Sequence, residues 1–111
     1  MGINAVQPAA KRPYGGIPVI TITNVAPGAA VRIDTGLANR TAVSVHNLGD
    51  FGLWLGFAVG VAIGNSEYIP GSPTAGARLG GFWAEEMGAG VPIYATSEGG
   101  INTVVVVEFV S

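Results

Sequence analysis

Hydrophobic and polar residues alternate with a period of two through most of the chain after residue 16, and glycine- or proline-rich breaks separate the runs. Successive side chains of a β-strand point to opposite faces, so this alternation predicts strands. We expect strands over residues 17–23, 29–34, 40–47, 51–57, 79–85, 91–96 and 101–110, with residues 59–63 continuing or pairing with the fourth. Residues 65–77 are rich in glycine, proline and serine and should form a loop. Short strands at about ten-residue spacing, with no helical period, predict a single antiparallel β-sandwich or barrel.

The segment 40–47 illustrates the alternation. Val43 and Val45 would share one face of the strand, and Ala42, Ser44 and His46 would share the other. The final segment differs, because it is apolar on both faces. Its two sets are Val105, Val107 and Phe109 on one side and Val104, Val106 and Val110 on the other. Such a strand is either central and covered on both sides, or packed outward on a neighbouring subunit.

Residues 1–16 show no such periodicity. They contain Pro8, Pro13 and a Gly15–Gly16 pair, which predict an extended N-terminal arm preceding a sandwich domain over residues 17–111. Arms of this kind often become ordered only on a partner. Lys11, Arg12 and Tyr14 are the candidate partner-contact residues of the arm.

The composition is informative mainly because charged residues are scarce. The 111 residues are 49% hydrophobic and only 11% charged, so part of the surface should be covered by a partner. The net charge of −2 gives no reason to expect nucleic-acid binding. The most apolar stretch, residues 51–64, is too short to span a bilayer, and the first residues lack the pattern of a signal peptide.

Candidate catalytic chemistry is sparse. There is one histidine and no cysteine, so no metal site or cofactor is expected. His46 lies four residues before Asp50, but no nucleophile motif accompanies the pair, and we expect His46 to be an outward-facing strand residue. We therefore expect a protein that is not an enzyme. The candidate aromatic residues for interfaces or sugar stacking are Trp54, Tyr68, Phe82 and Trp83.

Several of these segments together resemble a known family. The pattern N-R-T-x-V-x-V-x-N over residues 39–47 is followed by an aliphatic or aromatic strand ending in glycine at 53–56. A proline- and glycine-containing segment at 69–73, an Ile-Tyr-Ala strand at 93–95 and a valine-rich strand at 104–110 follow. This arrangement is similar to that of small β-sandwich virion proteins of tailed bacteriophages, which decorate the capsid or belong to the tail. The segment between the second and fourth of these motifs is longer here than in the family.

The resemblance implies a jelly-roll-like sandwich and a structural role on the virion. We expect a capsid decoration or cement protein, made in the host cytoplasm, whose partners are the major capsid protein and further copies of itself in a trimer or dimer. We expect no nucleic-acid or membrane partner. The alternative is a receptor- or carbohydrate-binding head of a phage fibre or tail protein, with Trp54, Tyr68 and Trp83 as stacking residues. A small β-fold enzyme is the third possibility.

Overall fold

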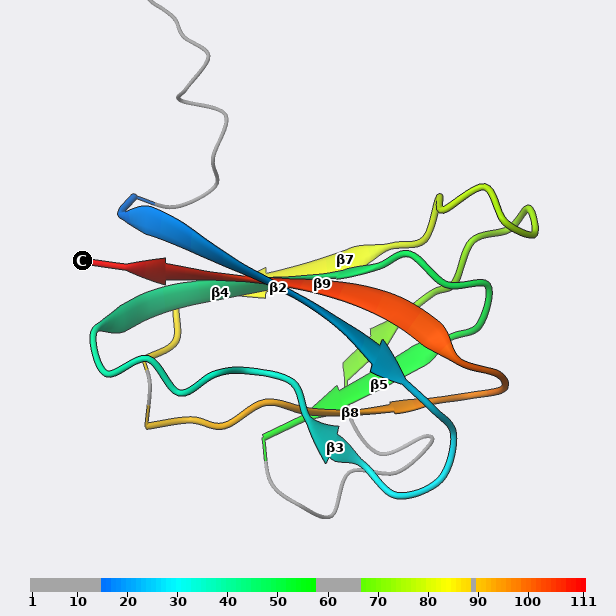
Figure 1. Ribbon diagram of the computed structural model, residues 1–111, viewed down its shortest axis with the longest axis horizontal. Helices are drawn as coiled ribbons and strands as arrows, with labels where there is room; N and C mark the ends of the chain where they lie inside the picture. Colours follow the sequence, from blue (N-terminus) through cyan, green and yellow to red (C-terminus); the bar gives the residue numbers. More distant parts are fainter. Residues whose placement is uncertain (1–14, 58–66, 89) are drawn as a thin grey trace, which may run out of the picture.

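The computed structural model describes residues 15–57, 67–88 and 90–111, and these residues contain strands but no helix (Figure 1). The prediction of an all-β chain is therefore confirmed. The strands are β2 (Ile17–Val25), β3 (Val31–Arg32), β4 (Arg40–Asn47), β5 (Leu53–Gly56), β6 (Glu67–Ile69), β7 (Phe82–Glu85), β8 (Tyr94–Ser97) and β9 (Asn102–Val110).

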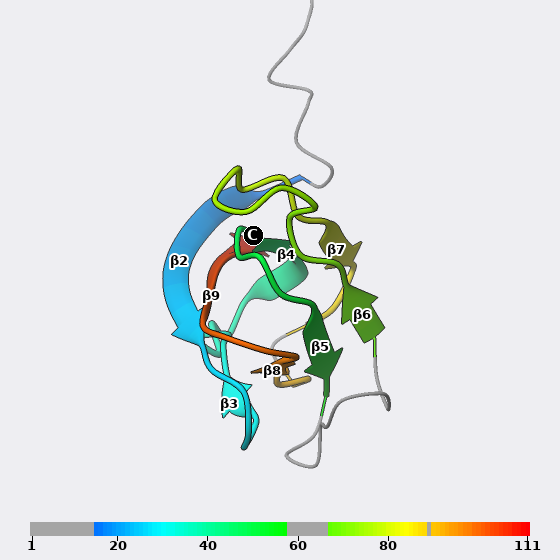
Figure 2. The ribbon, with the colours of Figure 1, turned by 90° about the vertical axis from the view of Figure 1, so that its right-hand side faces the viewer.

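The strands form two antiparallel sheets of four strands each. The long sheet has the order β2-β9-β4-β7, and the short sheet has the order β3-β8-β5-β6. The view along the strands shows the two sheets as separate layers, with β2, β9, β4 and β7 in one and β3, β8, β5 and β6 in the other (Figure 2).

The strand pairs are nested along the chain. β2 pairs with β9, β3 with β8, β4 with β7, and β5 with β6. Two further pairs, β4 with β9 and β5 with β8, join these hairpin-like pairs into the two sheets. The chain thus behaves as one long antiparallel ribbon that is rolled up, and β9 becomes a central strand between β2 and β4.

The core lies between the sheets and follows the predicted alternation. Val43 and Val45 of β4 face inward, while Ala42, Ser44 and His46 occupy the opposite face, as expected. The buried hydrophobic cluster draws on both sheets and on the adjoining loops. It comprises Val25, Ile33, Val43, Val45, Leu53, Leu55, Ile69, Ile93, Ala95, Val104 and Val106.

The observed strands differ from the predicted ones mainly in the short sheet. The strand over 40–47 has the expected bounds, and Pro18 lies near the start of β2, an edge strand, where a proline is tolerated. The strand expected over 29–34 is only Val31–Arg32. The loop expected over 65–77 contains β6, so that prediction is wrong at its start. The strand expected over 59–63 and most of the arm lie outside the described residues.

Candidate interaction surface

The outward side of the long sheet carries the most distinctive surface of the described residues. Strand register aligns its side chains in two rows across the four strands. One row runs Ile22, Val105, His46, Phe82, and the second runs Ile20, Val107, Ser44, Ala84. We call these eight residues the outer face. None of the eight carries a formal charge at neutral pH when His46 is neutral.

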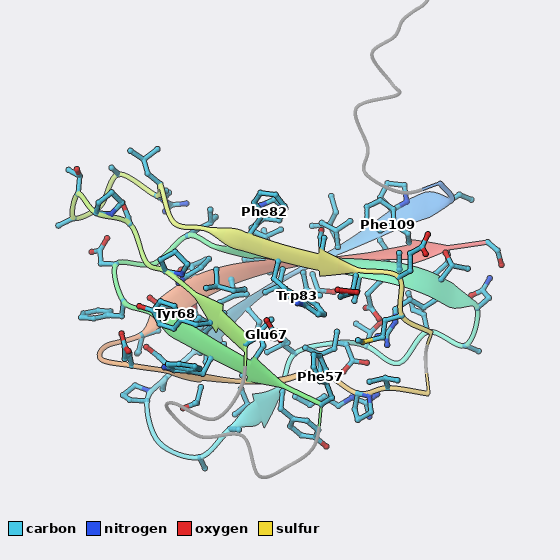
Figure 3. The ribbon with its side chains drawn as sticks, turned by 180° about the vertical axis from the view of Figure 1, so that it is seen from behind. Phe57, Glu67, Tyr68, Phe82, Trp83 and Phe109 are labelled. Atoms are coloured by element: carbon cyan, nitrogen blue, oxygen red, sulfur yellow. The ribbon has the colours of Figure 1, made fainter. Side chains whose placement is uncertain are left out.

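The outer face exposes large apolar side chains. Ile20 is 63% exposed, Ile22 68% and Phe82 65%, whereas the small Ser44 in the middle is only 3% exposed. Val105 and Val107 are half-buried beside it. In the view from behind, Phe82 lies on the far side of β7 from Trp83, together with Phe109 (Figure 3). A broad apolar sheet face of this kind is typical of a site covered by a partner.

His46 belongs to the outer face and takes part in ring stacking. Its imidazole lies parallel to the Phe82 ring, with centroids 5.3 Å apart and an interplanar angle of 16°. The expectation of an outward-facing strand histidine is confirmed, since His46 is exposed. Asp50, the potential catalytic partner, instead accepts a hydrogen bond from the backbone of Gly76 at 2.9 Å. Among the residues that the structure describes, His46 therefore stacks on Phe82, and Asp50 does not orient its imidazole.

The other predicted aromatic residues divide between two places. Trp54 and Tyr68 are register partners on β5 and β6, with ring centroids 4.8 Å apart, on the outward side of the short sheet. The Tyr68 hydroxyl donates to Glu98 at 3.3 Å, and partial burial together with that carboxylate raises the pKa of the phenol. The indole Nε1 of Trp54 is buried and has no partner among the described residues.

Trp83 takes a different position. It pairs with the inward-facing Val45, packs against the core and lies 5.7 Å from the ring of Phe57. The sequence placed Trp83 with Trp54 and Tyr68, but the structure brings only the latter two together. Lys11, Arg12 and Tyr14 lie outside the described residues.

A buried ionic cluster, which sequence reasoning missed, closes one end of the sandwich. Arg40 Nη1 lies 3.1 Å from Asp34 and 3.1 Å from Glu108, and all three side chains are fully buried. The Arg40 guanidinium also donates to the backbone carbonyls of Met87, Gly88 and Val91. The available signal was Glu108 amid valines, a charge in an otherwise apolar strand.

The cluster has a structural role, because its charged groups form ion pairs and hydrogen bonds with one another. Burial penalises the charged form of Asp34, but hydrogen bonds from Arg32 and the Ile93 amide, with the charges of Arg32 and Arg40, lower its pKa to about 2. Glu108 accepts hydrogen bonds from the amide and hydroxyl of Thr35. No group of histidine, cysteine and acidic residues suited to a metal occurs in the described part of the chain.

The fold and these surfaces define an all-β protein with an exposed apolar sheet face. No family model, no curated protein and no solved structure matches the chain. None of the described segments forms a helix of the length and hydrophobicity needed to cross a membrane.

Proposed function

We propose that this protein is a non-enzymatic structural protein of a bacteriophage virion, a decoration or cement protein that binds the outer capsid across neighbouring capsomers. The observation that carries the proposal is the apolar outer face of the long sheet, because such a surface is typical of a protein that works within an assembly, whether another copy or a different protein covers it. The sequence resemblance of residues 39–110 to phage virion proteins supports the same class.

The strand order supports the finer assignment to a jelly roll. In a jelly roll, an eight-stranded antiparallel ribbon is rolled into two sheets, and the architecture is used by viral capsid and lectin domains. The nested pairs β2–β9, β3–β8, β4–β7 and β5–β6 fit that scheme. Architecture alone does not fix function, so the strand order supports the proposal only together with the outer face.

The proposed mechanism is thermodynamic linkage. A protein that binds only the assembled shell stabilises that shell in proportion to the logarithm of its free concentration over its dissociation constant. In this proposal the arm, with Lys11, Arg12 and Tyr14, contacts the capsid, and self-association multiplies the number of arms that bind together. In this proposal the arm becomes ordered when it binds, so the entropy cost of ordering it belongs to binding and does not affect folding of the free protein.

Capsids that lack the protein provide the test. Added full-length protein should saturate them at a fixed copy number and raise the temperature at which the shells break open. Deleting residues 1–14 should lower occupancy at least tenfold while leaving the melting temperature of the free protein unchanged, because β2 begins at Ile17. The proposal fails if full-length protein does not bind the shells, and the role of the arm fails if the deletion leaves occupancy unchanged.

A second candidate function rests on Trp54 and Tyr68. Paired aromatic rings on an outward sheet surface, with the Glu98 carboxylate beside them, have the chemistry of a sugar-stacking platform. In that case the protein would be a receptor- or carbohydrate-binding head of a fibre or tail. Titration with neutral oligosaccharides should then shift the NMR resonances of Trp54 and Tyr68, and Tyr68→Ala should abolish the shifts. Phe51→Ala, which changes another exposed aromatic residue, is the matched control.

A further inference from the structure

We propose that the outer face of the long sheet is covered by the same face of a second copy, in a two-fold symmetric dimer. This inference deepens the proposed function, on which the role of the dimer in a shell rests, by naming the occupant of the apolar face. It is carried by the size, the lack of charge and the arrangement of large and small side chains on that face.

The outward side of the long sheet is large enough for a small dimer interface. β2 and β9 each contain nine residues, which at about 3.3 Å per residue gives a length of about 30 Å. β4 has eight residues and β7 only four, so four strands about 4.8 Å apart give the whole outward side of the sheet a flat area on the order of 500 Å². Protruding side chains such as Ile22 and Phe82 add accessible area to that figure. The total approaches the roughly 800 Å² that each partner contributes to a stable interface.

One row of the face pairs large side chains with small ones when two copies meet. In that row Ile20 and Val107 lie on β2 and β9, and the small Ser44 and Ala84 lie on β4 and β7, while the other row ends in His46 and Phe82. A two-fold axis parallel to the strands and between β9 and β4 lays β2 over the partner's β7 and β9 over the partner's β4. Ile20 then faces the partner's Ala84, and Val107 faces the partner's Ser44. Each contact occurs twice, as a two-fold interface requires.

The chemistry of the face favours this occupant over others. A strongly charged partner would find little complementary charge, because none of the eight side chains is charged when His46 is neutral. A lipid surface is usually engaged through lysine or arginine beside the apolar residues, and none of the eight positions supplies one. Two copies of a twisted antiparallel sheet, by contrast, pack well face to face with their strands nearly aligned.

The first test compares two isoleucines of equal exposure. Ile22 on the outer face is 68% exposed, and Ile101 in the connection before β9 is 66% exposed. We expect wild-type protein to have a dimeric mass in sedimentation equilibrium at micromolar concentration. Ile22→Lys should weaken the dimer at least about 100-fold, since it buries an unpaired charge twice, and Ile101→Lys should not. A monomeric or trimeric wild type would overturn the proposal, and so would an Ile22→Lys variant that dimerises normally.

A second test locates the axis. Because the chain has no cysteine, Ile22→Cys and Phe82→Cys can be made in separate chains and mixed. These positions lie three strands apart within one chain, about 14 Å, but face each other across the proposed interface. A short bis-maleimide should link the two variants to each other far more than it links Ile101→Cys with either. Equal yields for all pairs would overturn the arrangement.

Capsid binding is measured separately, so the two proposals can fail independently. Wild-type protein that dimerises through this face but does not bind shells would refute the proposed function and leave the inference standing. Protein that binds shells as a monomer, with occupancy lost in Ile22→Lys, would make the capsid the occupant of the face and refute the inference.

Discussion

Gly49 occupies a position that no larger residue can take without moving β9. A Cβ atom added there would lie 1.8 Å from Asn102 Oδ1 and 2.7 Å from Asn102 Cα. Asn102 is fully buried and holds the turn after β4, since its Oδ1 accepts from the Phe51 amide at 3.1 Å. We expect Gly49→Ala to lower the free energy of unfolding by about 1–3 kcal/mol, measured by urea denaturation.

Gly90→Ala is the matched control for that substitution. An added Cβ at Gly90 meets no atom within 4 Å, so its effect should stay within about 0.5 kcal/mol. Equal stability losses for the two variants would show that the close approach of Gly49 to β9 is not what sets the cost.

Asp34 gives a second prediction at the residue scale, on pH. Its pKa of about 2 in the folded protein lies below the ordinary 3.8, because Arg32, the Ile93 amide and Arg40 stabilise the carboxylate against the cost of burial. The unfolded chain therefore takes up this proton first as the pH falls. The contribution of Asp34, up to about 2 kcal/mol, is present in full above about pH 5 and is lost on acidification towards pH 2.

An NMR titration of the side-chain carboxyl carbon measures this directly. The Asp34 resonance should remain that of a carboxylate at pH 3, where an ordinary aspartate is mostly protonated. A midpoint at or above 3.8 would contradict the account of the buried cluster.

At the scale of one strand, the two faces of β9 have different partners. Substitutions on its inward face should therefore affect folding, and substitutions on its outward face should affect association. Val106 is fully buried in the core, and its neighbour Val107 lies half-buried on the outer face. Val106→Ala should cost about 1–3 kcal/mol of unfolding free energy at every protein concentration, since it leaves a cavity between the sheets. Chemical denaturation of the monomer at low concentration is the appropriate measurement.

Val107→Ala should behave differently. Val107→Ala should lower the unfolding free energy of the monomer by less than Val106→Ala does. The dissociation constant of the dimer should rise several-fold, because Val107 lies near the proposed axis. If the two variants were equally destabilised and the dimer unchanged, the outer face would be serving the monomer alone.

The elements also show what the sequence could predict. β4 was predictable because its alternation is long and strict, and β9 because it is a long run rich in valine. In both strands parity alone divided the side chains into two sets on opposite faces. β6 was missed because three residues in a proline- and glycine-rich segment carry too little pattern, and the segment becomes a strand only by pairing with β5. The outer face could not be predicted from strand parity alone. Its rows, such as Val105 beside His46, depend on the register between distant strands, and so does the Trp54–Tyr68 pair.

At the scale of the whole molecule, folding and dimer formation should be coupled. If two copies cover each other's outer faces, the melting temperature should rise by a few degrees for each tenfold increase in protein concentration. Ile22→Lys should flatten that dependence and Ile101→Lys should preserve it. A wild-type melting temperature independent of concentration from about 1 to 100 μM would contradict the coupling.

The nested pairing also bears on how the protein is made in the cell. β9 lies between β2 and β4 yet follows both in the sequence, so a ribosome releases the two flanking strands well before the strand that joins them. At ordinary translation rates the interval is on the order of several seconds, during which β4 has no partner strand at the edge where β9 will pair, although β7 is already available at its other edge. The long sheet therefore cannot be completed until β9 has been made, and slower synthesis lengthens the exposure of the strands that wait for it. Yield in a foreign host should depend on chaperone supply more than on codon choice in the first half of the gene.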